Sequence, residues 1–285
     1  TGWTLYGCTS NTALADMASL RSNDTSGGCY VIETSNGAAY YWLAGLDMEC
    51  TDANAGGSAY SSYAIDLNHH GDTSVSTLDN HIIFDRDYIS GAPTKGVNKG
   101  IFADGAYIGI VNSYNWNVFA PGFGDNNAIW CLNGPGPLAI LNNTLNSDGQ
   151  GTFMGGDNIT VQNSMCSDID IEHNHFYKSI AAGTGSTNST TSITITASTA
   201  GPFMPPMTIT DTGGCIPGFT TIVSGPTGGG TGTYVLSAAA TCTNASDTFN
   251  AVPTGKNAIE FKHGERVKVA RNFFENAGAS GQARS

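Results

Sequence analysis

The chain is poor in charge. Only 12% of its 285 residues are Asp, Glu, Lys or Arg, about half the usual share of about 25%. Eleven Lys and Arg against 23 Asp and Glu leave a net charge of -12. Nucleic-acid backbones are bound by clustered cations, so this balance argues against a nucleic-acid partner. An acidic glycan would also be repelled unless a cation bridged it, and Ca²⁺ is the one cofactor we consider.

Long apolar runs and metal-binding cysteine motifs are also missing. No stretch approaches about 18 apolar residues, so no membrane span is predicted, and the first residues do not form a signal peptide, which indicates a mature chain or an excised fragment. The seven cysteines form no C-x-x-C pair or zinc-type cluster. They indicate a secreted or cell-surface protein with a few disulfides, among which Cys215 and Cys242 would close a local loop, and the odd number leaves one thiol over.

Turn-forming and strand-forming residues are abundant instead. The chain holds 37 glycines and is rich in Asn, Ser and Thr, which favour turns, while its Val, Ile, Tyr and Phe favour strands. The fold class is therefore predicted to be all-β. With 40% hydrophobic residues, the chain has enough apolar surface to bury a core.

An internal repeat runs through the middle of the chain. Five segments align without gaps, each a short strand followed by a turn: 81–89, 107–115, 137–145, 168–176 and 266–274. One apolar column comprises Ile82, Ile108, Leu138, Ile169 and Val267, and a second comprises Phe84, Ile110, Ile140, Ile171 and Val269. Side chains two residues apart share one face of a strand, so we expect all ten in the core.

A polar column follows three residues after the second apolar one. It comprises Asp87, Ser113, Asn143, Asn174 and Asn272. Stacked asparagines hydrogen-bond to one another and to turn backbone, so an asparagine ladder is predicted at this corner. Further strands are expected before the repeats at 100–102, 128–130, 151–153 and 258–260, and an earlier repeat is expected at 40–46.

Stacked repeats of this kind are typical of a parallel β-helix, a solenoid in which each coil pairs with its neighbours. We assign 1–180 to its first part and 256–280 to its last coil. The almost uncharged segment 183–252 alternates apolar and polar residues, which predicts a small inserted β module. A β-sandwich is the alternative for the whole chain and a disordered linker for the insert, but neither explains these patterns.

Several strings resemble a known group of proteins. They are GAPTKGVNKGI at 91–101, NGPGPLAILNN at 133–143, MGGD at 154–157 and SDIDIEHNHF at 167–176. Together they resemble bacterial exported right-handed parallel β-helix proteins related to the pectate-lyase superfamily, over about 80–180 and 256–277. The string TTIVSGPTGGGTGTY at 220–234 resembles a Gly/Thr-rich β module of phage structural and bacterial surface proteins. The resemblance implies a right-handed fold and no particular reaction.

The densest acidic group lies in one repeat. Asp168, Asp170 and Glu172 alternate along a strand and should share its outer face, with His173 at the following turn. Paired carboxylates act as general acid and base or hold Ca²⁺, and Asp170 and Glu172 should lie roughly 7 Å apart. The alternative is a solvated polar face without a catalytic role.

Other candidates lie in neighbouring repeats. Asp85 and Arg86 are candidate substrate-binding residues, with a local ion pair as the alternative. Lys262 or His263 would be the Brønsted base of a lyase. Trp130 and Glu260 share a column and would contact sugar if they point outward, whereas an inward Trp130 would be core.

These observations lead to two hypotheses. In the first, the chain is an exported protein that binds a polysaccharide or cell-surface glycan and cleaves it as a lyase or glycoside hydrolase through carboxylates on an outer sheet. In the second, it is a non-enzymatic surface protein, adhesin or phage-tail-like β-helix that recognises a glycan or another partner. End coils without caps would expose sheet edges and favour oligomers.

Overall fold

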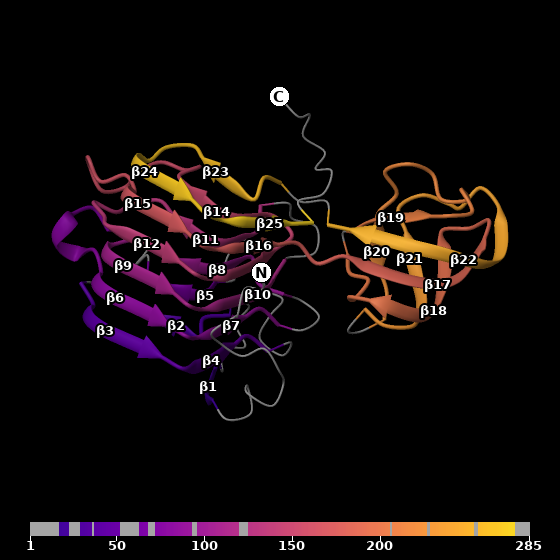
Figure 1. Cartoon of the computed structure of the whole chain (residues 1–285), viewed down its shortest axis with the longest axis horizontal. Helices are drawn as coiled ribbons and strands as arrows, with labels where there is room; N and C mark the ends of the chain where they lie inside the picture. Colours follow the sequence, from indigo (N-terminus) through magenta and orange to yellow (C-terminus); the bar gives the residue numbers. More distant parts are fainter. Residues whose placement is uncertain are drawn as a thin grey trace. The chain divides into compact units, whose positions relative to one another are not determined.

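The structure is a computed structural model. It describes residues 17–22, 29–35, 37–51, 63–67, 72–92, 96–119, 125–205, 207–226, 229–253 and 256–276. These residues form two compact units, one from the described parts of Thr1–Tyr177 and Asn257–Ala277 and the other from those of Lys178–Lys256 (Figure 1). The described residues form strands and one short 3-10 helix, Val75–Thr77, so the all-β prediction is confirmed. Among them, no helix is long and apolar enough to cross a membrane.

The first unit consists of three parallel sheets, which we call A, B and C. Sheet A contains β1 (Ala18–Arg21), β4 (Leu46–Glu49), β7 (Tyr88–Ser90), β10 (Tyr114–Val118), β13 (Thr144–Ser147), β16 (His175–Tyr177) and β25 (Phe273–Glu275). Sheet B contains β2 (Ile32–Glu33), β5 (Tyr63–Asp66), β8 (Lys99–Phe102), β11 (Asn127–Cys131), β14 (Gln150–Met154) and β23 (Ile259–Phe261). Sheet C contains β3 (Ala39–Ala44), β6 (Asn80–Asp85), β9 (Ala106–Val111), β12 (Leu138–Leu141), β15 (Ser167–Glu172) and β24 (Glu265–Ala270).

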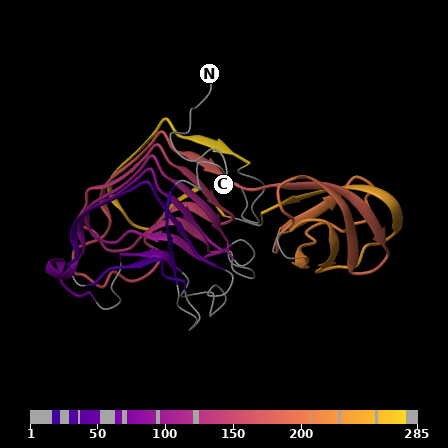
Figure 2. The ribbon, with the colours of Figure 1, turned by 90° about the horizontal axis from the view of Figure 1, so that it is seen from below.

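The chain visits the sheets in the order B, C, A and then starts again, so strands stack in sequence order within each sheet (Figures 1 and 2). The register within sheet C is the one that the repeat alignment predicted. Leu138 lies opposite both Ile108 and Ile169. In sheet B, Ile129 lies opposite both Ile101 and Thr152, as the second set of predicted strands required.

One apolar core lies between the three sheets. Eight of the ten predicted core side chains are at most 3% exposed. The prediction is wrong for Val267 and Val269, which are 38% and 45% exposed. Both belong to β24, which ends sheet C, so no described strand packs beyond them.

The predicted asparagine ladder is present at the corner between sheets C and A. Asn143 Oδ1 accepts a hydrogen bond from the backbone N–H of Ser113 at 2.8 Å, and Asn174 Oδ1 accepts one from Asn143 at 2.9 Å. Asn272 Oδ1 accepts the next, from Asn174, at 2.8 Å. The amide nitrogens donate to the buried carbonyls of Ile110, Ile140 and Ile171. The ladder therefore satisfies turn groups that would otherwise be buried unpaired.

Three disulfides join the cysteines Cys29–Cys50, Cys131–Cys166 and Cys215–Cys242. The third is the predicted local pair. The seventh cysteine, Cys8, lies outside the described residues.

The second unit is an antiparallel sheet. Its strands run in the order β19 (Thr208–Asp211), β22 (Thr243–Val252), β17 (Ala181–Asn188), β18 (Ser192–Ala200), β21 (Gly232–Leu236) and β20 (Ile222–Ser224). Its core contains Phe203, Tyr234 and Phe249, each at most 1% exposed. Burial raises the pKa of Tyr234 to about 12, and its hydroxyl donates to the Gly230 carbonyl at 2.5 Å. The alternating segment thus builds an ordered β structure.

Candidate functional site

The outer face of sheet C gathers most of the predicted site residues. Side chains that alternate with the core positions point away from the core, and the register aligns them in rows across the strands. Asp85 lies on β6, and Asp168, Asp170 and Glu172 lie on β15 of the same sheet. Arg86 and His173 occupy the turns that follow these two strands. The structure therefore brings six of the ten predicted residues onto one face.

The last strand supplies two cations to the acidic end of this face. Arg266 Nε and Nη2 donate to Asp168 Oδ1 and Oδ2 at 2.5 and 3.0 Å, and these hydrogen bonds lower the pKa of the Asp168 carboxyl. Lys268 Nζ lies 3.6 Å from Asp170 Oδ2 and also pairs with Glu172. Each of the three carboxylates thus has a cationic partner from β24, which competes with a substrate proton or a metal ion for its oxygens.

The other end of the face is aromatic, and sequence reasoning missed it. Tyr40, Trp42 and Tyr107 are 79%, 68% and 54% exposed. The His81 ring lies between the two tyrosines, with centroids 4.8 Å from Tyr40 and 4.4 Å from Tyr107 and nearly parallel planes. The sequence did contain a signal for it: His81 and Tyr107 are both the first residue of their aligned segments, one position before the first apolar column.

This row has an unusual backbone. Tyr40, His81 and Tyr107 have φ of 65°, 53° and 56°, and Asp168 and Arg266 continue the series at 50° and 51°. Positive φ is unfavourable for bulky residues, yet every one of these strands adopts it near its start. The bend recurs in five of the six strands of sheet C, and β12 has Pro137 at this position, after Gly136 at a φ of 77°. It therefore belongs to most copies of the repeat.

Asp85 accepts hydrogen bonds from side chains at the aromatic end. Its side chain is 11% exposed, and it accepts hydrogen bonds from Asn112 Nδ2 at 2.9 Å, from Arg86 Nε at 3.0 Å and from the Trp42 side chain. Burial raises the pKa of this carboxyl, but the hydrogen bonds outweigh burial and hold the pKa below its ordinary value. Asp85 therefore orients the side chains of Trp42 and Arg86. The Trp42 ring is exposed, but its hydrogen bond to Asp85 restricts its orientation.

Trp130 lies on sheet B, within a separate aromatic stack. Its ring lies 4.1 Å from Phe102 and 6.5 Å from Phe153, nearly parallel to both, and its indole N–H donates to the Gly155 carbonyl at 2.7 Å. Phe102 and Phe153 are at most 9% exposed. Trp130 alternates with Ile129 and Cys131 of the core and so points outward from sheet B, where it is half-buried and packs against Tyr63, Phe102 and Leu132. It is therefore covered by a separate aromatic cluster and does not lie in the core between the sheets.

Glu260, Lys262 and His263 also lie at sheet B. Lys262 Nζ lies 2.7 Å from Glu260 Oε1, and Gln150 Nε2 donates to Glu260 Oε2 at 2.9 Å. His263 Nε2 lies 3.4 Å from the Leu132 carbonyl, and its ring lies so close to Gly155 that a Cβ there would sit 2.6 Å from Nδ1. This group therefore lies on a different sheet from the carboxylate row.

Two groups of the described residues have metal-ligand spacing: Asp104 with Cys131 and Cys166, and Asp211 with Cys215 and Asp247. All three cysteines are in disulfides and offer no thiolate. Calcium binding stays a prediction. No protein-family model matches the chain, and neither a curated protein nor a solved structure is significantly similar to it.

Proposed function

We propose that the first unit is a right-handed parallel β-helix of the pectate-lyase type from an exported protein, and that the outer face of sheet C binds a glycan without cleaving it. The sequential strand order in three parallel sheets and the asparagine ladder support the fold. Three disulfides support export, because disulfides persist mainly in oxidising compartments.

The exposure of Tyr40, Trp42 and Tyr107 on one face carries the proposal. Clustered exposed aromatic side chains mark binding surfaces, because their transfer out of water into an interface lowers the free energy. Aromatic side chains offer apolar area together with a polar tip, which suits a ligand with both C–H faces and hydroxyls. A sugar ring is such a ligand, and the tethered Trp42 would lose little freedom on binding it.

The ion pairs favour binding over cleavage. A glycosidase needs one carboxylic acid to donate a proton and one free carboxylate opposite it. Here Arg266 and Lys268 engage the whole carboxylate row. The first of the two hypotheses, cleavage through these carboxylates, therefore has less structural support than the second.

A neutral polysaccharide fits this face best. The net charge of -12 disfavours a polyanion, and the aromatic end is formed mainly by the exposed rings of Tyr40, Trp42 and Tyr107. Neighbouring strands lie about 4.8 Å apart. An extended glycan that runs across the strands would therefore contact one outward side chain from each strand that it crosses.

The test is a binding measurement on the full chain. Isothermal titration with neutral and acidic polysaccharides would compare the parent with Trp42→Ala and Tyr107→Ala, with Phe273→Ala on sheet A as the control for an exposed aromatic. We expect binding of a neutral glycan, weakened about tenfold by each of the first two changes, about 1.4 kcal/mol. Equal binding by all variants, or the appearance of new reducing ends or unsaturated uronates, would contradict the proposal.

A further inference from the structure

One phenylalanine of the second unit is almost fully in solvent. Phe219 is 94% exposed and has a φ of 62°. A bulky residue at positive φ is a genuine backbone outlier. Gly218 beside it is also exposed, whereas Ile216 and Thr220 are 9% and 1% exposed, so Phe219 is the large apolar side chain that the loop 212–220 presents to solvent.

The loop that carries Phe219 is braced on both sides. The disulfide Cys215–Cys242 ties its start to the opposite segment, and the Asp211 carboxylate accepts the backbone N–H groups of Cys215 and Ile216 at 2.7 and 2.9 Å. On the other side, the Thr220 hydroxyl donates to the Pro217 carbonyl at 2.7 Å. These contacts fix the backbone of the loop. A side chain on a fixed backbone loses little conformational entropy when it enters a partner, which is the property of an interface anchor.

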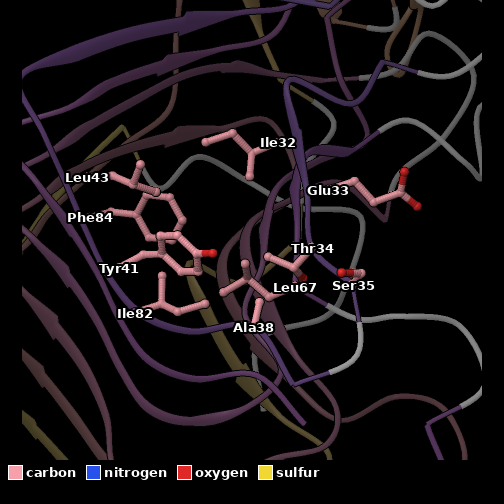
Figure 3. Close-up of a pocket in the computed structure, with 10 residues that line it drawn as sticks. All are labelled: Ile32, Glu33, Thr34, Ser35, Ala38, Tyr41, Leu43, Leu67, Ile82 and Phe84. Atoms are coloured by element: carbon pink, nitrogen blue, oxygen red, sulfur yellow. The ribbon is translucent and has the colours of Figure 1, made fainter. Parts of the chain in front are cut away.

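An apolar cavity of about 280 Å³ lies at the first end of the β-helical core (Figure 3). Its apolar walls are Ile32, Leu43, Leu67, Ile82 and Phe84. Among the described strands, β3 is the last of sheet C on this side, so Tyr41, which points inward, stays 55% exposed at the cavity. A cavity of about 150 Å³ with Leu, Ile and Phe walls is large enough for a benzene ring.

We propose that Phe219 of one copy inserts into this cavity of a second copy. The ring matches the cavity in size and chemistry, and one chain carries both halves of the contact. Charge favours this partner, because the segment 179–255 contains no Lys or Arg and only Asp211 and Asp247. Such a segment has no attraction for anionic lipids or nucleic acid, and it can approach an acidic second copy with little repulsion.

The contact is heterologous, since the anchor and the cavity are different surfaces. After pairing, one copy keeps a free cavity and the other keeps a free Phe219, so association continues into open chains instead of stopping at a dimer. The cavity uses inward side chains of sheet C, whereas the glycan face uses outward ones, so self-association and glycan binding are separate properties.

Analytical ultracentrifugation of the full chain over a range of concentrations tests the proposal. We expect concentration-dependent oligomers larger than dimers for the parent and for the control Tyr107→Ala. Phe219→Gly should be monomeric and at least as resistant to urea, because glycine adopts positive φ without a Cβ clash. Phe219→Leu should retain association, and Tyr41→Lys, which puts a charge at the cavity, should be monomeric.

A mixing experiment is the decisive arm. Phe219→Gly keeps the cavity and Tyr41→Lys keeps the anchor, so an equimolar mixture should give heterodimers that do not grow further. A parent that is monomeric at every concentration, oligomers that survive Phe219→Gly, or a mixture that stays monomeric would each overturn the proposal.

Discussion

The side-chain oxygen of Asn174 accepts the backbone N–H of Asn143 at 2.9 Å, one repeat away, while its amide nitrogen donates to the Ile140 carbonyl at 2.7 Å. Both atoms of one buried amide thus complete the backbone of the preceding repeat. Asn174 is 1% exposed, so no water would replace these hydrogen bonds if the side chain were lost.

Asn174→Ala should therefore destabilise the first unit by about 2 to 4 kcal/mol, since it leaves two or more buried backbone groups without partners. Urea unfolding followed by tryptophan fluorescence would measure this. The matched control is Asn158→Ala, at an exposed loop position, which should change stability by less than about 0.5 kcal/mol. Equal effects of the two changes would show that the ladder is not a stabilising element.

Asp87 occupies the same column as these asparagines but is an acid. It is 2% exposed, its Oδ1 accepts the Leu46 N–H at 2.8 Å, and its Oδ2 is buried without a hydrogen-bond partner. Burial raises its pKa from 3.8 to about 7. The folded chain therefore keeps this proton between pH 3.8 and about 7 while the unfolded chain loses it.

Stability should fall as the pH rises through that window, because the folded state binds more protons there, and it should level off above pH 7. Asp87→Asn should remove this contribution and stabilise the chain most at pH 8. Urea midpoints of both proteins at several pH values from 4 to 8 would check the difference. A difference that does not depend on pH would show that Asp87 is ionised throughout.

Much of the fold could be predicted because each repeat contacts only its neighbours. In such a stack, residues such as Ile108 and Leu138 align in space as they align in sequence, so a gapless alignment gives the register directly. Val267 fits the same apolar column, but its burial depends on what lies beyond β24, and the column carries no information about that.

The candidate site was predicted less well, for a related reason. The carboxylate row could be placed on one face from alternation alone, but its cationic partners Arg266 and Lys268 lie 98 residues later in the chain. The alignment already puts Lys268 in the column of Asp170, so this ion pair could have been predicted from the sequence. The exposure of Tyr107 could not have been predicted in this way. Alternation shows that a side chain points outward, but it does not show whether another segment covers it.

The ion-pair row can be tested as a structural feature. Glu172 is 7% exposed and pairs with Lys268, so Lys268→Ala leaves a nearly buried carboxylate with only the His173 ring, whose Nδ1 lies 3.8 Å from Oε2, as a basic neighbour. We expect a loss of about 1 to 3 kcal/mol in urea unfolding. The double change Lys268→Ala with Glu172→Gln should recover much of it, because the unpaired charge is gone. If the double variant is as unstable as the single one, the charge is not the cause.

Asp85 tests whether Trp42 must be held in place for binding. Asp85→Ala removes the acceptor for the Trp42 and Arg86 side chains without removing any exposed ring. If binding needs a tethered indole, affinity for a neutral glycan should fall about threefold to tenfold, because the ring must then be ordered on binding. Arg86→Ala, which keeps the Asp85 carboxylate, should have little effect. An equal loss for both variants would instead place Arg86 in contact with the glycan.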